Sequence, residues 1–450
     1  MKKTLLSCLL LLASSALLSA QQVMKYKPLF KGDNTRVQIE KNPCTSACNH
    51  YAYPGPKQQS LTPAPKGYEP VYFSHYARHG SRWLIAKDDY SGPYEILLRA
   101  DSLGKLTPLG KQTLEKLARL NRASHLRLGE LTLLGAQQHR EIAQRMYRNF
   151  PEIFARRGLK IDARSTTVFR VALSMENELQ EICKLNPSVE ILHDASEADM
   201  YYLNRPQAFL DSTKFRPAVQ AVYDEYCRQH DTAPTVMPRL FNDETYWKTQ
   251  IDATTLAFNL YRIAGNVQST ELRHEFTLYD IFTNDELYEN WLRTNAWWYI
   301  AFGPSPLNDG MQPFTQNALL RNFIETADTC LLQENPTVTL RFGHEVDLLP
   351  FACLLEIDEF GKRVRNLDDL DEEGWHSQRI FPMGCNIQWI FYRNKKNPDD
   401  ILIKVLLNEN EARLPLPKQQ APYYRWSDFR AYYMKKLARF DAWLQTADRQ

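Results

Sequence analysis

Two arginines enclose a histidine in the segment Arg78-His79-Gly80-Ser81-Arg82. Guanidinium groups suit phosphate oxygens because they form paired, charge-assisted hydrogen bonds with them, and the glycine lets the backbone pass close to whatever is bound. A neutral imidazole beside a bound phosphate could attack phosphorus, and the surrounding positive charge would favour the deprotonated ring and stabilise the transition state. The segment therefore predicts a phosphate site, with a basic surface turn as the alternative interpretation.

A second histidine precedes two acids in the segment Gly343-His344-Glu345-Val346-Asp347. The imidazole of His344 could hold phosphate. Transfer of a phosphoryl group to a histidine also needs an acid that protonates the departing alkoxide, and the same group, once ionised, can activate the water that breaks the phosphohistidine. Glu345 and Asp347 are the two candidates for this proton donor, although a histidine next to an acid is commonplace by itself.

A third segment, Arg164-Ser165-Thr166-Thr167-Val168-Phe169-Arg170, could add a further guanidinium to such a site. Taken alone this signal is weak, because arginines on a protein surface are ordinary. Its value depends on whether the fold brings Arg164 or Arg170 close to the other two segments.

The elements around these segments predict how they come together. A short β-prone run at 71–73 leads directly into the first segment, and another at 337–342 ends at Gly343-His344. Further strands are expected at 160–165, 386–392 and 401–407, and helices at 106–121, 132–150 and 171–184. Alternating strands and helices favour a mainly parallel α/β sheet covered on both faces, in which ligands bind at the carboxyl ends of the strands.

Helical patterns dominate between about 186 and 328, which predicts an inserted helical subdomain. Its segment 285–302 contains several large aromatic residues, which we expect in the core rather than stacked on a substrate. The predicted organisation is a signal peptide at 1–20, an extended N-terminal arm at 21–67, an α/β domain built from 68–185 and 329–450, and the helical subdomain at 186–328.

The chain begins as exported proteins do. Lys2 and Lys3 precede an apolar run over 4–18, and Ser19-Ala20 supply the small residues typical of a signal-peptide cleavage site. Cleavage after Ala20 predicts a periplasmic or extracellular protein, or one held at the cell surface. No later stretch of the sequence is apolar enough to span a bilayer.

The mature chain is expected to be formally neutral. Without Lys2 and Lys3, the 55 basic residues fall to 53, which equals the number of acidic residues. This balance argues against nucleic acid or an anionic membrane surface as the main partner, so a small phosphorylated substrate would be held by a local cationic cluster. Of the cysteines that remain, Cys44 and Cys48 could bridge a small loop, and the lack of a second close pair argues against a metal site.

These segments and their order resemble the histidine acid phosphatases. The first segment matches the RHGxR signature of that family, and His344-Glu345 resembles its second motif, which usually has a histidine followed by aspartate. Residues 131–139 resemble a segment common between the two motifs, and 279–303 resemble a helical part of the family. Residues 405–416 are similar to the branch of multiple inositol polyphosphate phosphatases. The resemblance extends over about 68–437.

The resemblance implies a phosphoglycerate-mutase-like α/β fold with a helical insertion, and no metal or organic cofactor. It implies His79 as the nucleophile that forms a phosphohistidine. The residues that would hold the phosphate are Arg78, Arg82, Arg170 and His344, with Arg164 as the alternative third arginine. Glu345 takes the position of the usual aspartate and is preferred over Asp347 as the proton donor, because Asp347 could instead cap the following helix.

The activity that the resemblance implies is hydrolysis of phosphate monoesters, with inositol polyphosphates such as phytate as preferred substrates. One departure bears on the substrate: the inositol polyphosphate branch usually has histidine, alanine and glutamate, whereas here the acid follows His344 directly. Two alternatives stay open, a broad-specificity acid phosphatase and a phosphoanion-binding protein that has lost catalysis. The oligomeric state does not follow from the sequence.

Overall fold

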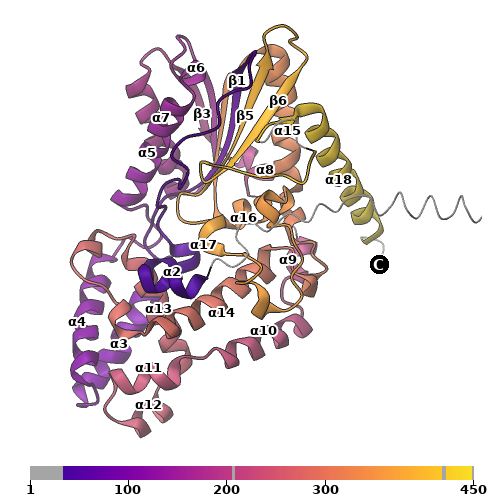
Figure 1. Cartoon of the computed structure of the whole chain (residues 1–450). Coiled ribbons are helices and arrows are strands. Elements are labelled where there is room, and N and C mark those ends of the chain that lie inside the picture. The colour runs from indigo at the N-terminus through magenta and orange to yellow at the C-terminus, as the bar shows by residue number, and fades with distance from the viewer. Residues whose placement is uncertain (1–33, 205–207, 418–421, 448–450) are drawn as a thin grey trace, which may run out of the picture.

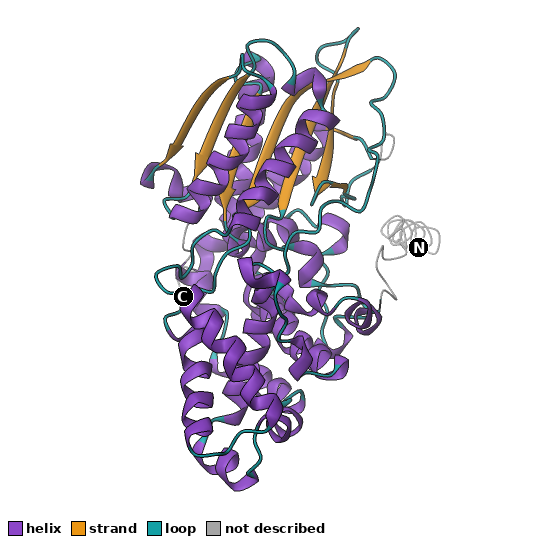
Figure 2. Cartoon of the chain, turned by 90° about the vertical axis from the view of Figure 1, so that its left-hand side faces the viewer, coloured by secondary structure: helices purple, strands orange, loops and turns teal. Residues whose placement is uncertain are grey.

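The computed structural model describes residues 34–204, 208–417 and 422–447. The upper part of the molecule in Figure 1 is a sheet with helices on both sides, and the lower part consists of helices. Figure 2, turned by 90°, shows the same division between the strands and the helical part. The signal peptide expected at 1–20 lies outside the described residues, so export stays a prediction.

The sheet has eight strands in the order β3-β2-β4-β1-β5-β6-β7, with β8 paired to β6. The strands are β1 Tyr68–Arg78, β2 Lys160–Ser165, β3 Glu190–Ala195, β4 Val338–Gly343, β5 Asn386–Asn394, β6 Ile401–Leu407, β7 Asn410–Glu411 and β8 Tyr424–Arg425. Strands β3, β2, β4 and β1 run parallel, and β5 to β8 extend this block in antiparallel. The predicted α/β class is confirmed, and both histidine segments follow strands of the parallel block.

Strands β1 and β4 lie side by side and end together. Arg78 of β1 is in register with Gly343 of β4, so the chain leaves both strands at the same edge, just before His79 and His344. All six residues of β4 are buried, as expected for a parallel strand covered on both faces. The two histidine segments therefore meet at the carboxyl edge of the sheet.

The side chains of β1 alternate between two cores. Phe73 and Ala77 belong to one core, and Tyr72 and Tyr76 to the other, as the two-residue period of a strand requires. The covering helices are α5 Leu133–Asn149, α6 Pro151–Phe154 and α7 Phe169–Leu185 on the first side, and α15 Asn317–Gln333, α16 Glu345–Leu354 and α18 Trp426–Ala447 on the second. Figure 1 shows these two layers on either side of the strands.

The lower part is built mainly from helices that the sequence pattern predicts. Its main helices are α3 Asp88–Ser102, α4 Pro108–Ala123, α10 Pro217–Gln229, α11 Ala233–Leu240, α12 Glu244–Gln250, α13 Ala253–Val267 and α14 Asn284–Phe302. Trp291, Trp298 and Tyr299 of α14 are buried, whereas Trp297 is only partly so. Three of these four aromatic side chains therefore lie in the core, as expected.

The shorter helices connect the two parts. They are α2 Thr35–Lys41, α8 Met200–Leu203, α9 Ala208–Thr213 and α17 Ser377–Ile380, with the 3-10 helices η1 Pro43–His50, η2 Glu197–Asp199, η3 Glu271–His274, η4 Tyr279–Ile281, η5 Pro306–Asn308, η6 Gln312–Gln316, η7 Ile357–Glu359 and η8 Leu367–Asp369. The predicted boundaries at 186 and 328 stay predictions. Strand β3 follows the first boundary yet pairs with β2, and α3 and α4 precede it yet pack on α13 and α11.

The segment expected as an extended arm is helical over 35–50, whereas 51–67 contain neither a helix nor a strand. The Asn34 side chain accepts a hydrogen bond from the N–H of Val37 and caps α2, and Asn42 accepts one from the N–H of Cys44 and caps η1. Both asparagines are good N-cap residues. Because α2 and η1 pack on α14, and η1 on α13, residues 35–50 form part of the helical layer.

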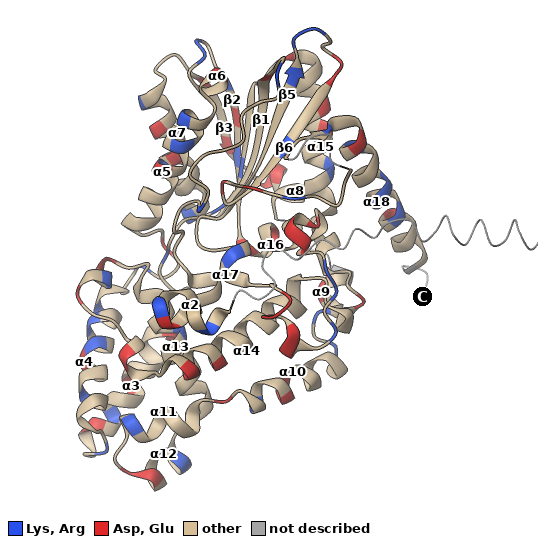
Figure 3. Ribbon diagram, viewed as in Figure 1, with Lys and Arg blue, Asp and Glu red and all other residues tan. Residues whose placement is uncertain are grey.

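Charges of both signs are interspersed on helices such as α7 and α18 (Figure 3). Among the described helices, none combines the length and the apolar character needed to cross a membrane. The seven cysteines of the described residues carry free thiols, so Cys44 and Cys48 do not form the small bridge that their spacing would allow.

Candidate active site

The loop that follows β1 packs against the N-terminal halves of α5 and α7. The N–H of Gly80 donates to Ser174 Oγ (3.1 Å), and the N–H of Ser81 donates to Gln138 Oε1 (2.9 Å). Thr132 caps α5 by accepting from the N–H of Gly135, and its hydroxyl also donates to the Ser81 carbonyl (3.0 Å). A Cβ on Gly80 would lie 2.4 Å from the Gly135 carbonyl oxygen, so only glycine allows this approach.

His79 presents one ring nitrogen to the site. Its Nδ1 lies 2.9 Å from the Gly80 carbonyl oxygen, so the proton belongs on Nδ1 and the lone pair on Nε2. Nε2 is 3.4 Å from Glu345 Oε2. Burial, together with the charges of Arg78 and Arg170, lowers the pKa of His79 well below its usual value. The ring is therefore neutral and nucleophilic at Nε2.

Arg78 donates hydrogen bonds to two backbone carbonyls. Its Nη1 donates to Asn49 O (2.7 Å) and Phe381 O (2.9 Å), while Nε lies 3.0 Å from Glu345 Oε2. Asn49 follows Cys48, whose φ of 49° and ψ of −116° are strained for a residue other than glycine. The turn of η1 thus directs the Asn49 carbonyl toward Arg78, a contact that sequence reasoning did not predict.

Arg82 completes a pair of fixed guanidinium groups. Its Nη1 donates to the Trp83 carbonyl (2.9 Å), and Nη2 lies 3.7 Å from Glu345 Oε1. Among the described residues, neither Nη2 of Arg78 nor Nε of Arg82 has a hydrogen-bond partner. Buried donors of this kind are suited to an oxyanion.

The third segment contributes Arg170 to the site and leaves Arg164 outside it. Arg170 lies in the first turn of α7. Burial lowers the pKa of its guanidinium, whereas the negative charge of Glu345 acts in the opposite direction. Arg164 instead shares a face of β2 with Asp162, whose carboxylate is 2.8 Å away, and it also pairs with Asp194 and Asp199 at 3.8 Å. The preferred arginine is therefore near the cluster, and the alternative is neutralised by acids.

Exchanging Arg170 for alanine is expected to lower kcat/KM for phosphate monoesters by about 10- to 100-fold. A charge-assisted hydrogen bond contributes about 1.5–3 kcal/mol, and each 1.4 kcal/mol corresponds to a tenfold change. Arg164→Ala is the matched control and should change kcat/KM by less than about threefold, because its partners are carboxylates. Steady-state kinetics on both variants would refute the assignment if the larger loss belonged to Arg164→Ala.

His344 is the N-cap residue of α16 and lies across the site from His79. The two rings are 5.7 Å apart between centroids and inclined by 71°. His344 Nε2 lies 3.2 Å from Thr166 Oγ1, a contact that the sequence did not reveal. Burial and the neighbouring arginines lower the pKa of His344 to about 4, so the ring is neutral at physiological pH.

Glu345 occupies the first turn of α16 and faces the arginine cluster. Burial by itself raises the pKa of the Glu345 carboxyl, but the charge of Arg78, the contact with His79 and the charge of Arg82 outweigh it and hold the pKa well below its usual range. The carboxylate is 3.0 Å from Arg78 Nε and 3.7 Å from Arg82 Nη2. It therefore forms ion pairs with the guanidinium groups that a phosphate would need.

Asp347 lies behind the site rather than in it. Its side chain is 2% exposed, with Gln316 Nε2 3.4 Å from Oδ1, and burial raises the pKa of its carboxyl well above the usual value. It does not cap the following helix: α16 begins at Glu345, so Asp347 is already in the first turn. Of the two acids, only Glu345 forms an ion-pair contact with His79 among the described residues.

The two histidines and Glu345 also form the group whose ligand atoms are close enough to hold a cation, within 4.8 Å of one another. The guanidinium groups of Arg78 and Arg82 stand beside the same carboxylate. Their positive charge repels a metal ion and attracts an anion. The donor set therefore fits phosphate better than a metal.

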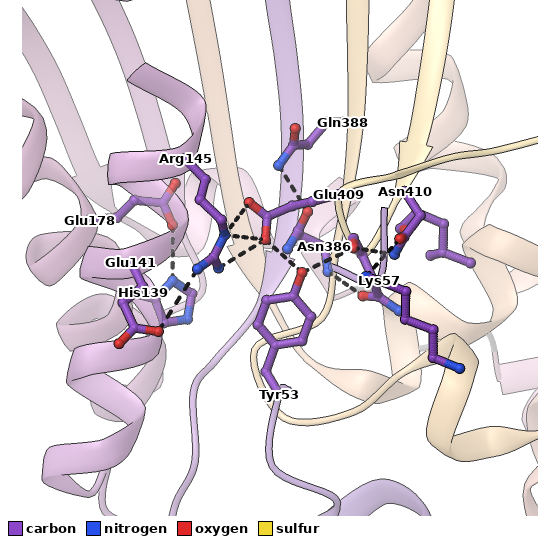
Figure 4. A network of polar contacts seen from close by, with 12 residues as sticks. Tyr53, Lys57, His139, Glu141, Arg145, Glu178, Asn386, Gln388, Glu409 and Asn410 are labelled. Atoms are coloured by element: carbon purple, nitrogen blue, oxygen red, sulfur yellow. Dashed lines mark hydrogen bonds and ion pairs between the residues drawn. The ribbon is translucent and has the colours of Figure 1, made fainter. Parts of the chain in front are cut away.

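A buried polar network fixes the helices behind the nucleophile (Figure 4). His139 of α5 lies 2.9 Å from Glu178 of α7, and the Arg145 guanidinium pairs with Glu409 at 2.9 Å. The hydroxyl of Tyr53 donates to the same Glu409 carboxylate (2.6 Å). Through Glu409, the segment at 405–416 that resembles the inositol polyphosphate branch thus connects α5 to Tyr53 of the N-terminal segment.

Comparisons with known proteins agree with this geometry. The profile of the histidine phosphatase superfamily (branch 2) matches residues 77–408. The structure is similar to the Bifidobacterium longum multiple inositol polyphosphate phosphatase in complex with phosphate, with 20% identity, a TM-score of 0.72, and coverage of 86% of this chain and 97% of that one. It is also similar to the phytase from D. castellii, with 15% identity, a TM-score of 0.64, and coverage of 93% and 90%. No curated protein sequence matches the chain.

Proposed function

Because the chain belongs to branch 2 of the histidine phosphatase superfamily and is a phosphatase, we propose that it hydrolyses phosphate monoesters through a phosphohistidine on His79. The observation that carries this proposal is the position of Nε2 of His79. This neutral nitrogen faces the cluster of Arg78 and Arg82, and the Glu345 carboxyl lies 3.4 Å from it. Nucleophile, oxyanion donors and proton donor are thus gathered in one place.

In the first step, the lone pair of Nε2 forms a bond to phosphorus while the ester P–O bond breaks. The departing alkoxide takes a proton from Glu345 and leaves as the alcohol. The Nδ1–H of His79, held by the Gly80 carbonyl, stabilises the ring as it becomes positively charged. The guanidinium groups carry the charge that spreads over the phosphoryl oxygens.

In the second step, the Glu345 carboxylate takes a proton from a water molecule whose oxygen attacks phosphorus. The N–P bond breaks, its electron pair returns to Nε2, and orthophosphate leaves with Glu345 protonated again. This step suits a carboxyl that can lose and regain its proton between the two half-reactions. Asp347 is less suited to it, because it lies behind the site beside Gln316.

We propose inositol polyphosphates such as phytate as the preferred substrates, and action outside the cytoplasm. The substrate proposal is supported by the fold that the chain shares with a multiple inositol polyphosphate phosphatase and a phytase. At sequence identities of 20% and 15%, these similarities show the fold and not the substrate. The second part rests on the basic start and the apolar run at 4–18. A protein found in the periplasm or medium, shortened by its first 20 residues, would support export.

The test is phosphate release by the purified mature chain from phytate and from p-nitrophenyl phosphate, across mildly acid to neutral pH. Release from both, faster from phytate, is the expected result. Release from p-nitrophenyl phosphate alone would replace the substrate proposal with a broad-specificity acid phosphatase. A folded protein that binds phosphate and releases none from either substrate would overturn the catalytic proposal and leave a phosphoanion-binding protein.

A further inference from the structure

A cavity of about 600 Å³ opens beside the reacting phosphate site, and Arg82 is part of its wall. The rest of the wall comes from four helices of the lower part, η1, α10, α13 and α14. Since Arg82 also faces Glu345 in the catalytic cluster, the cavity adjoins the place where a phosphate would react. A substrate bound there would extend its body into this space.

One face of α13 lines the cavity. Phe258, Tyr261, Arg262 and Gly265 all contribute to the wall, and their spacing of three and four residues places them on a single stripe of the helix. A Cβ on Gly265 would lie 3.1 Å from the Cβ of Ala47, so the glycine lets η1 pack closely on α13. The stripe therefore presents two rings and a guanidinium to the cavity.

Besides Arg82, the wall contains a second buried guanidinium with unmet hydrogen-bonding capacity, that of Arg293 on α14. It is 7% exposed, and its Nε and Nη1 have no hydrogen-bond partner among the described residues. The nearest carboxylate, that of Asp231, lies 3.9 Å from Nη1, beyond hydrogen-bond distance, and the guanidinium carbon is 4.8 Å from the centre of the Phe258 ring. Buried donors without acceptors cost free energy that an anionic ligand would recover.

The remaining wall is aromatic and weakly charged. Tyr223, Trp297 and Trp298 add rings that can lie against the body of a substrate. Arg262 is already paired with Asp89 at 3.0 Å and one third exposed, so it adds a partly neutralised charge. Asp224 also lines the cavity, but it is exposed and its charge is screened by solvent.

We propose that Arg293, assisted by Arg262, forms a second anion subsite, and that the substrate is a phosphate monoester carrying at least one further phosphate or comparable anionic group. The reacting phosphate lies at His79 and Arg82, the second anion at Arg293, and the body between them rests on the rings of α13 and α14. This inference rests on the proposed function, because it assumes that a phosphate reacts at His79. It names Arg293 as a residue that determines specificity.

The test compares two substrates in Arg293→Gln. Phytate carries further anionic groups and p-nitrophenyl phosphate does not, so kcat/KM should fall about 10- to 100-fold more for phytate than for p-nitrophenyl phosphate, the loss expected for charge-assisted hydrogen bonds. Arg228→Gln is the matched control: Arg228 lies on α10, is 67% exposed and pairs with Glu225. It should show no difference between the substrates. Equal losses for both substrates in Arg293→Gln would overturn the subsite.

Binding separates this proposal from the catalytic one. In the His79→Ala background, Arg293→Gln should weaken binding of myo-inositol hexasulfate, a non-hydrolysable polyanion, at least tenfold more than binding of inorganic phosphate. Titration calorimetry decides this even if the chain hydrolyses neither substrate. Thermal melting reports whether the buried substitution is tolerated. If Arg293→Gln does not fold, the same comparison is made with the more exposed Arg262→Gln. A greater loss of affinity for hexasulfate than for phosphate then supports the subsite, and equal losses of affinity for the two anions refute it.

Discussion

Replacing His79 with alanine is expected to abolish phosphatase turnover, with a fall in kcat of about 10⁴-fold or more. The effect is this large because the substitution removes the atom that bonds to phosphorus. The imidazole of His344 is neutral too, but its Nε2 is engaged with Thr166 at 3.2 Å. The measurement is release of p-nitrophenolate by purified wild-type and variant enzymes.

The same variant should still bind inorganic phosphate, with an affinity within about tenfold of wild type. Arg78 is held by the carbonyls of Asn49 and Phe381, and Arg82 by that of Trp83, so the oxyanion donors stay in place without the imidazole. Exposed His125 provides a control histidine. Rapid quenching of wild type with labelled substrate should trap an acid-labile phosphoryl group that His79→Ala lacks, and turnover above about 1% in the variant would rule out the phosphohistidine route.

The meeting of the two histidine segments was predictable because it depends on local signals and one topological rule. Each segment follows a β-prone run, and parallel strands of an α/β sheet present their carboxyl ends at one edge. The structure bears this out in the register of Arg78 with Gly343. The preference for Arg170 over Arg164 could also have come from strand alternation, because Asp162 and Arg164 are two residues apart and share a face of β2.

Other parts of the site could not be predicted because they depend on contacts between distant segments. Asn49 acts through its backbone carbonyl, which any residue carries, and its position depends on the left-handed turn at Cys48. Thr166 contacts His344 across 178 residues of sequence. Arg293 differs from an ordinary helical arginine only in the burial that leaves Nε and Nη1 without partners among the described residues.

Replacing Glu345 with glutamine is expected to slow turnover of alkyl phosphates by about 10²–10⁴-fold, the usual contribution of a general acid–base group. The two half-reactions should separate on p-nitrophenyl phosphate. Its leaving group departs without a proton, so the first step survives, whereas the second step still lacks its base. Stopped-flow measurement should therefore show a burst of about one p-nitrophenolate per enzyme, followed by slow release.

The control for this variant is Asp347→Asn. The raised pKa of Asp347 keeps that carboxyl protonated, and asparagine resembles the neutral acid in shape and charge. Turnover should fall far less than in Glu345→Gln, and no burst is expected. The opposite pattern, a burst in Asp347→Asn and normal turnover in Glu345→Gln, would move the proton donor to Asp347.

Glu345→Gln should also bind inorganic phosphate more tightly than wild type at neutral pH, and with a weaker dependence on pH. In wild type the carboxylate competes for Arg78 and Arg82, which hold its pKa well below the usual range. Bound phosphate engages those arginines and adds negative charge, so the pKa of Glu345 rises and the complex takes up a proton. Affinity is therefore greatest below the pKa of Glu345 in the free protein and declines until pH has passed its higher pKa in the complex. Calorimetry in buffers of different ionisation enthalpy measures this uptake, and because phosphate itself titrates equally in both proteins, the difference between them belongs to Glu345. Equal proton uptake by both would mean that the carboxylate does not share the phosphate site.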